Sequence, residues 1–224
     1  MKSKLLVLPL ALLLGGNSFA ADSALNTDKK KISYAIGLQL GNDFKRGGLD
    51  IDTNALKLAI DDMLSGKAPQ LTEKELADTM NLFREQQMKK QSMAADDNKA
   101  KGEAFLAANK SKPGVKILPS GVQYKVLNSG SGKSPTANNS VVAHYRGTLV
   151  DGTEFDSSIK RGQPATFPVT GVIKGWQEIL QKMKVGDKWE VYIPSELAYG
   201  ARGQGPIIGP NAALIFEIEL LEIK

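Results

Sequence analysis

The sequence predicts an α+β protein, in which an all-helical amino-terminal region and a long connecting helix precede an antiparallel sheet wrapped round one short helix. Two observations predict this class. Apolar residues recur at helical spacing from residue 27 to about residue 110, and at the alternating spacing of strands after Pro113 and Gly114. We therefore divide the chain into four segments, 1–20, 21–72, 73–110 and 111–224.

The first segment has the three-part pattern of a cleaved secretory signal. Lys2 and Lys4 precede an apolar run over residues 5–14, and small residues lead up to Ala20. We expect cleavage after Ala20, and no lipid on the new amino terminus because no cysteine lies near it. The exported chain is then expected in the periplasm, at the outer membrane or at the cell surface.

Composition excludes several classes of function. The chain has no cysteine, which excludes disulfides, thiolate nucleophiles and cysteine metal sites. Its single histidine, His144, faces away from the apolar row of Ala143 and Tyr145, which favours a structural or solvated role over a zinc site or a catalytic triad. Removal of Lys2 and Lys4 lowers the net charge from +5 to +3, too little for nucleic-acid binding. We expect no metal, no cofactor and no nucleic-acid partner.

The first two helices are short. Apolar residues at i, i+3 and i+4 predict a helix from about Thr27 that ends at Gly47 and Gly48. A second helix is predicted to begin with Asp52 or Thr53 as its cap and to continue to Gly66.

The third helix is long. Thr72 and Glu75 have the spacing of a capping box, and nothing interrupts the helix before Pro113 and Gly114. Its second half, residues 91–112, is mostly polar, and a helix that is polar all round is either a connector through solvent or unstable. Its first half carries an apolar stripe of Leu76, Met80, Phe83 and Met88.

Four methionines in the helical half, Met63, Met80, Met88 and Met93, have two interpretations. They fill a core, or they belong to a surface that binds a partner. Two short helices cannot cover the apolar stripe of a long one, and a helical hairpin is too small to bury its own core. A homodimer with interlocked amino-terminal helices would cover these side chains.

Alternating apolar residues predict strands in the carboxy-terminal segment, five or so in all. One window has helical spacing and places Trp176, Ile179, Leu180 and Met183 on one face. Trp176 is then either a core residue of this short helix or the floor of a pocket. The clearest alternating runs are residues 122–126, 141–145, 189–193 and 214–220.

Two motifs fail on spacing. The stretch GSGKS at residues 130–134 lacks the first glycine of a phosphate loop, because Leu127 stands there, so a turn is predicted. Asp151, Glu154 and Asp156 lack the spacing and the terminal glutamate of a calcium loop. What remains is Asp156 and a set of aromatic residues from separate elements, as in a ligand cleft. The aromatic residues are Tyr145, Phe155, Phe167, Trp176, Tyr199 and Phe216.

Three long stretches resemble the FK506-binding proteins, which are peptidyl-prolyl cis-trans isomerases. They are residues 147–158 (GTLVDGTEFDSS), 172–200 (beginning VIKGWQEIL) and 214–223 (LIFEIELLEI). The likeness extends over nearly all of the chain after the signal to the bacterial macrophage infectivity potentiator group. The resemblance implies a dimerisation region at 21–72, a connecting helix at 73–110 and an isomerase domain at 111–224.

The resemblance also implies the pocket. Trp176 would lie under a proline ring, the Ile173 N–H and the Tyr199 hydroxyl would donate to ligand carbonyls, and Tyr145 and Arg161 would hold Asp156. This chain has Ala165 where some members have an aromatic residue, and its 201–210 loop differs, with Gln204 near a position that histidine can occupy. The implied catalytic residues are Tyr145, Asp156, Phe167 and Tyr199, and the implied substrate-binding residues are Phe155, Arg161, Val172, Ile173, Trp176 and Phe216.

We therefore expect an isomerase that accelerates rotation about X–Pro bonds in unfolded exported polypeptides. The resemblance implies FK506- and rapamycin-type inhibitors as ligands and adds chaperone activity from the cleft of a homodimer. An alternative is a non-catalytic chaperone that uses the pocket only to dock proline. A third reading, a purely structural surface protein, predicts no isomerase activity.

Overall fold

The computed structural model describes residues 25–224, so the predicted signal at 1–20 lies outside the described residues. Contacts divide the chain into two units, Met1–Leu58 and Ala59–Lys224, which we describe separately. None of the helices within residues 25–224 is long and apolar enough to cross a membrane.

The first unit contains α1 (Asp28–Arg46) and the start of α2 (Thr53–Leu64). The Thr27 side chain accepts a hydrogen bond from the Lys30 N–H at 3.3 Å, and Gly47 ends the helix. Before α2, the Asp52 carboxylate accepts hydrogen bonds from the N–H groups of Asn54 and Ala55 at 2.8 and 3.1 Å. Both helices and the Asp52 cap are thus confirmed.

The second unit begins within α2 and includes α3 (Glu73–Asn109), which starts with the predicted capping box of Thr72 and Glu75. The second half of α3 is not fully solvated, because Gly102 and Asn109 are buried and the Phe105 ring lies 5.8 Å from the ring of Tyr192 on the sheet. Asn109 donates to the Gln123 side chain at 3.0 Å. The last turns of α3 are therefore docked on the sheet, and the expectation of a solvent-crossing or unstable segment is wrong for them.

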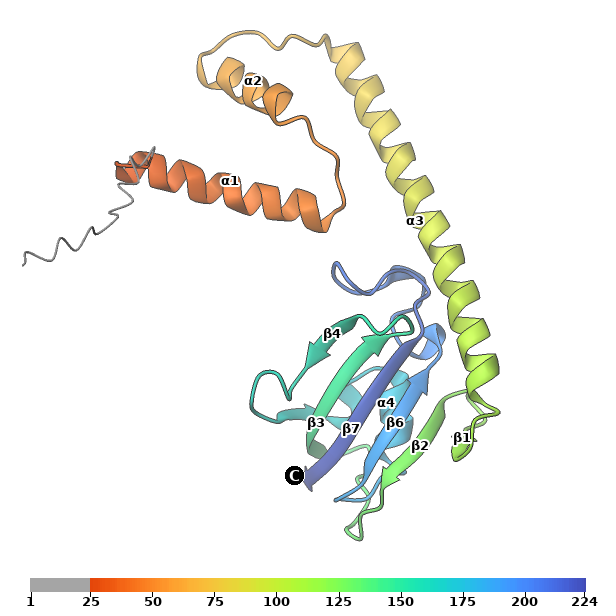
Figure 1. Cartoon of the computed structure of the whole chain (residues 1–224). Helices are drawn as coiled ribbons and strands as arrows, with labels where there is room; N and C mark the ends of the chain where they lie inside the picture. The colour runs from red at the N-terminus through yellow and green to blue at the C-terminus, as the bar shows by residue number, and fades with distance from the viewer. Residues whose placement is uncertain (1–24) are drawn as a thin grey trace, which may run out of the picture. The chain divides into compact units, whose positions relative to one another are not determined.

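The sheet has seven strands, all antiparallel. Six of them follow the order β1-β2-β6-β7-β3-β4 (Figure 1), and β5 pairs with β3. The additional strands are short, with three or four residues each, so alternation alone did not indicate them. The strands are β1 (Val115–Ile117), β2 (Gln123–Asn128), β3 (Ser140–Leu149), β4 (Glu154–Ser157), β5 (Ala165–Pro168), β6 (Lys188–Ile193) and β7 (Leu214–Ile223).

The core lies between one face of the sheet and α4 (Lys174–Leu180). The helix starts two residues before the predicted window and ends at Leu180, and Met183, three residues after it, is fully buried. Fully buried strand residues such as Val191 and Ile218 contribute the other side. Single turns of 3₁₀ helix lie at η1 (Val169–Gly171), η2 (Ser195–Leu197) and η3 (Gly200–Arg202).

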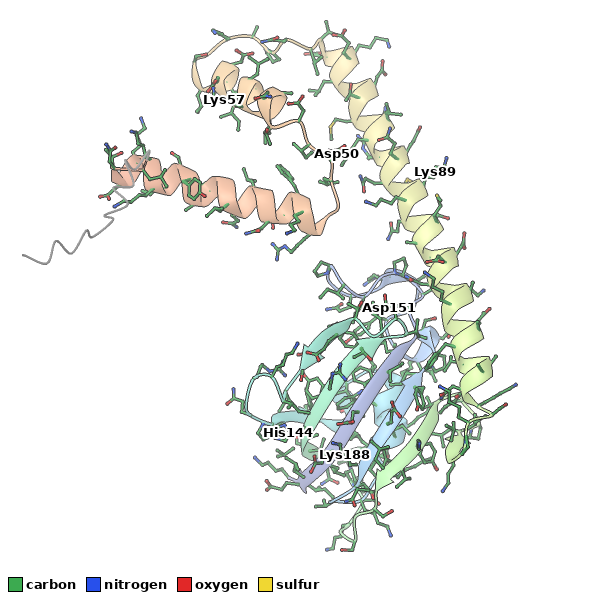
Figure 2. The ribbon with its side chains drawn as sticks, in the orientation of Figure 1. Asp50, Lys57, Lys89, His144, Asp151 and Lys188 are labelled. Carbon is green, nitrogen blue, oxygen red and sulfur yellow. The ribbon has the colours of Figure 1, made fainter. Side chains whose placement is uncertain are left out.

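His144 lies on β3, on the face opposite the buried row, as predicted (Figure 2). Its Nδ1 lies 3.1 Å from the Ser158 hydroxyl, which is fully buried. The hydroxyl of Ser158 also accepts a hydrogen bond from the Tyr145 N–H at 2.8 Å. His144 therefore has a structural contact at the end of β4.

The methionines do not fill a core within the described chain. Met63, Met80, Met88 and Met93 are 67%, 44%, 69% and 64% exposed. The same holds for the larger apolar side chains of α1, in which none of the residues is buried. The core interpretation is therefore wrong for these residues, and the partner-surface interpretation stays a prediction.

Candidate functional site

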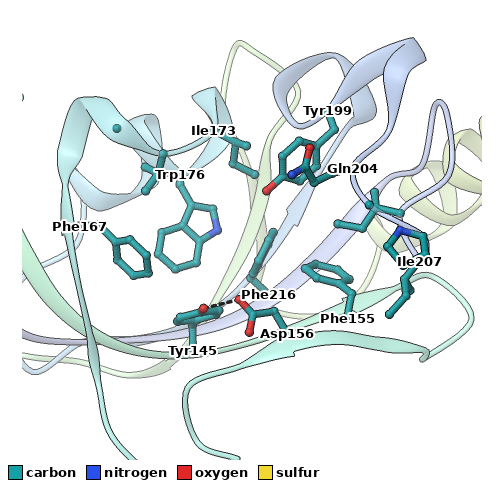
Figure 3. Close-up of a pocket in the computed structure, with 15 residues that line it drawn as sticks. Tyr145, Phe155, Asp156, Phe167, Ile173, Trp176, Tyr199, Gln204, Ile207 and Phe216 are labelled. Atoms are coloured by element: carbon teal, nitrogen blue, oxygen red, sulfur yellow. Dashed lines mark hydrogen bonds between the residues drawn. The ribbon is translucent and has the colours of Figure 1, made fainter. Parts of the chain in front are cut away.

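A cavity of about 540 Å³ opens between α4, the sheet and the loop that precedes β7 (Figure 3). Its wall is largely apolar, with six aromatic residues, and contains one carboxylate, that of Asp156. It is lined by Tyr145, Phe155, Asp156, Phe167, Gly171, Val172, Ile173, Trp176, Tyr199, Gln204, Gly205, Pro206, Ile207, Ile208 and Phe216.

Trp176 forms the floor of the cavity and is only 3% exposed. Three aromatic rings meet its indole edge-on, with centroid distances of 5.5 Å to Tyr145, 5.7 Å to Phe167 and 5.2 Å to Phe216. Edge-to-face packing of this kind holds aromatic rings in fixed orientations. Trp176 is therefore both a core residue and a pocket residue.

Glycine at position 175 allows α4 to approach the sheet closely enough for Trp176 to form the floor of the cavity. A Cβ on Gly175 would lie 2.5 Å from the Cγ2 of Ile193, so a larger residue would push α4 off the sheet. Gly147 has a similar role beneath the side wall, because its Cβ would lie 2.5 Å from the ring of Phe155. The Phe155 ring instead packs edge-on against Phe216 at 5.5 Å.

A three-residue cluster lies at one edge of the cavity. The Tyr145 hydroxyl and the Arg161 guanidinium donate to the two carboxylate oxygens of Asp156, and Arg161 also donates to the Tyr145 oxygen at 2.7 Å. Arg161 is not one of the lining residues and acts on the cavity only through its two partners. This closed triangle fixes the direction of the Asp156 carboxylate.

The charge states of the cavity follow from these contacts. Burial alone would raise the pKa of Asp156, but hydrogen bonds from Tyr145 and Arg161 outweigh it and lower the pKa below its ordinary value of 3.8. Burial raises the pKa of Tyr145, and the hydrogen bond to Asp156 adds to that effect. Burial, with the nearby charge of Asp156, also raises the pKa of Tyr199. At neutral pH the cavity thus contains one carboxylate and two protonated phenols.

Two groups at the opposite edge have hydrogen-bond donors. Ile173 precedes α4 as its N-cap, and its carbonyl accepts from the N–H groups of Trp176 and Gln177 at 3.0 and 3.1 Å. As the N-cap residue, Ile173 itself has a backbone N–H with no partner within the helix. The phenol of Tyr199, which lines the same cavity, is the second donor (Figure 3).

Nine of the ten site residues that the resemblance implied line this one cavity. The tenth, Arg161, does not line it but binds Asp156 and Tyr145, which do. Sequence reasoning missed residues 204–208 as a wall of the cavity, although it noted that the 201–210 loop differs between family members. The paired Ile207 and Ile208 among glycines and prolines are the signal that could have indicated an apolar rim. Among residues 25–224, no group of three acidic, histidine or cysteine side chains could hold a metal ion.

Comparison with known proteins gives a consistent result. The profile described as FKBP-type peptidyl-prolyl cis-trans isomerase matches residues 131–221, and the profile of the domain amino-terminal to such isomerases matches residues 29–126.

The similarity to individual proteins extends over almost the whole chain. The Outer membrane protein MIP of Legionella longbeachae is 47% identical over 100% of this chain and 99% of its own. The Peptidyl-prolyl cis-trans isomerase Mip of Coxiella burnetii is 47% identical over 99% of both. The crystal structure of FkpA from Escherichia coli aligns with a TM-score of 0.65 and 36% identity, over 90% of this chain and 99% of that one.

Proposed function

Because the chain belongs to the FKBP-type peptidyl-prolyl cis-trans isomerases and is an enzyme of that class, we propose that the aromatic cavity is its active site. In this proposal a substrate proline ring sits on Trp176, between Tyr145, Phe167 and Phe216. The observation that carries it is the Asp156 carboxylate, fixed by Tyr145 and Arg161 at the edge of an otherwise apolar cavity.

The reaction needs no nucleophile. Rotation about an X–Pro bond passes through a twisted amide, over a barrier of about 18–20 kcal/mol for peptide bonds in general. Water stabilises the planar amide more than the twisted one, because the planar form has the greater charge separation. A cavity that removes water and supplies fixed dipoles therefore favours the twisted state. The proposed catalytic groups are Tyr145, Asp156, Phe167 and Tyr199, with the Ile173 N–H binding a substrate carbonyl.

The rate of peptide isomerisation should not change between about pH 5 and pH 9. The Asp156 carboxylate loses its charge only below its lowered pKa, and Tyr145 and Tyr199 lose their protons only above their raised ones. No group in the proposed site therefore titrates in that window. Exchange NMR on a proline tetrapeptide measures the rate directly. A bell-shaped profile would indicate acid–base catalysis and contradict the proposal.

An FK506-type inhibitor is the control for that assay and for proline-limited refolding of a protein substrate. We propose that such a compound occupies the cavity, so it should abolish the acceleration in both assays at every pH. Acceleration that persists at a saturating inhibitor concentration would place the activity elsewhere in the chain.

We also propose that the chain is exported and acts on proline-containing polypeptides outside the cytoplasm. The signal pattern of residues 1–20 supports export, and one relative that matches the full chain is called an outer membrane protein. The proposed destinations are the periplasm, the outer membrane and the cell surface.

We propose a homodimer that forms through the helices of the amino-terminal half. Its support is the exposure of apolar side chains on the first half of α3, where Leu76 is 52% exposed and Met80 44%. A contiguous exposed apolar stripe of this kind usually marks a protein interface. Chaperone activity from the cleft of such a dimer is the second candidate function, favoured by the same exposed residues.

The double variant Leu76→Lys and Met80→Lys should be monomeric at micromolar concentration, where the unaltered protein should sediment as a dimer. Lysine at both positions would bring charge into the interface without partners. The variant should keep peptide isomerisation but lose suppression of aggregation. Asn81→Lys with Gln91→Lys adds the same charge at exposed polar positions of α3 and should stay dimeric. A monomeric unaltered protein would end the dimer proposal.

A further inference from the structure

Residues 203–211 form a loop, which we call the rim loop, and its residues 204–208 line the side of the cavity that sequence reasoning missed. Gln204 and Ile208 pair across it, through N–H to carbonyl hydrogen bonds of 2.8 and 3.3 Å. Gly203 and Gly205 take positive φ angles of 68° and 58°, which glycine adopts without strain. This pairing closes the tip of the loop but does not fix how the tip sits relative to the cavity.

The other end of the rim loop is attached to α3. The Asn98 side-chain amide donates to the Pro210 carbonyl at 2.9 Å, and the Asn211 amide lies 3.4 Å from the Ala95 carbonyl. Asn211 has a φ of 57°, the only positive φ of a non-glycine residue in the described part of the chain. A residue stays in the left-handed conformation only where surrounding contacts stabilise it. For Asn211 one of these contacts comes from α3, more than a hundred residues earlier in the chain.

The approach of α3 to this end of the loop is close. A Cβ on Gly102 would lie 3.0 Å from the Cβ of Ala213, just before β7. A Cβ on Gly209 would lie 2.7 Å from the Asn98 amide nitrogen. The Asn98 amide therefore lies in close contact with the loop at Gly209, next to the Pro210 carbonyl that accepts its hydrogen bond.

We propose that Asn98 is a positioning residue for the isomerase site, because it anchors the rim loop that selects the side chain next to the substrate proline. The proposal rests on the aromatic cavity being the active site. Asn98 does not line the cavity and acts only through the loop. Ile207, at the tip, is 43% exposed and free to pack on a substrate residue beside the proline.

The residues proposed to contact the substrate proline ring, which we call the proline seat, lie on different elements from the rim loop. Trp176 belongs to α4, and the rings around it belong to β3, β5 and β7. Releasing the loop should therefore leave the seat intact and change only the discrimination between neighbouring side chains. The measurable quantity is the ratio of kcat/KM for a Leu-Pro tetrapeptide to kcat/KM for an Ala-Pro tetrapeptide.

The test uses full-length protein without its signal and four variants. Asn98→Ala removes the hydrogen bond, and Gly209→Ala displaces the same amide from the loop side. Each should lower the Leu-Pro to Ala-Pro ratio by about threefold, as expected for one hydrogen bond. The double variant should be no worse than either single one, because both remove one contact. Asp96→Ala, an exposed position on the same helix, is the matched control and should leave the ratio unchanged.

A ratio of rates does not depend on the fraction of folded protein, so partial unfolding cannot imitate the expected result. If Asn98→Ala fails to fold, Gly209→Ala alone still tests the anchor. An unchanged ratio in both single variants, or losses that multiply in the double variant, would overturn the proposal. A failure of the active-site proposal looks different, because Asp156→Leu would then leave both peptides at full rate.

Discussion

Replacing Asp156 by leucine is expected to lower kcat/KM for proline peptides by about tenfold or more while the domain stays folded. Leucine has the same branched shape as aspartate but cannot accept the hydrogen bonds of Tyr145 and Arg161. A tenfold loss corresponds to about 1.4 kcal/mol of transition-state stabilisation. The cost in folding stability should be small, because the side chains of Asp156 and Arg161 are 42% and 46% exposed and the freed guanidinium can turn to water.

The strand β4 contains a matched control. Glu154 is also a carboxylate bound by two cations, Arg146 at 2.7 Å and Lys160 at 2.8 Å, but it does not line the cavity. Glu154→Leu should therefore keep the isomerase rate, measured by exchange NMR at equal concentrations of folded protein. Equal losses in the two variants would mean that Asp156 acts through the stability of β4 and not through the site.

The helix ends were predictable from the sequence because caps are local. Thr72 and Glu75 are three residues apart, and so are Thr27 and the N–H that it caps. The long strands were predictable for a similar reason, since alternation within one strand reports its buried face. β1, β4 and β5 were not, because three or four residues cannot establish a period.

The residues of the pocket were predicted from the family resemblance and not from the periodicity of the sequence. Tyr145 and Phe216 lie on strands that pair only in the folded sheet, and no local pattern brings either of them to Trp176. The contact of α3 with the rim loop was hidden for a further reason. The face of α3 that contacts the loop does so through an amide, Asn98, and a glycine, Gly102. Neither residue is a large apolar one, so from its composition this face of the helix cannot be told from a face exposed to solvent.

Replacing Trp176 by alanine should lower the free energy of unfolding by about 3–5 kcal/mol, because it removes one of the two tryptophan side chains from a packed core. That is a large share of the roughly 5–15 kcal/mol that stabilises a typical domain, so denaturation should occur at a clearly lower urea concentration. Loss of activity in this variant would not separate folding from binding. Phenylalanine is the milder change, because it keeps a ring and removes an indole N–H that is buried without a partner in the described chain.

The two tryptophans provide a direct test of where proline binds. Trp189 is 6% exposed, stacks on Tyr124 at 4.5 Å and also buries an unpartnered N–H, but it does not line the cavity. In Trp189→Phe the remaining indole is Trp176, and its fluorescence should change as a proline peptide or an FK506-type inhibitor is added. In Trp176→Phe the remaining indole should not respond. Equal responses, or none from Trp176, would remove it as the floor of the substrate site.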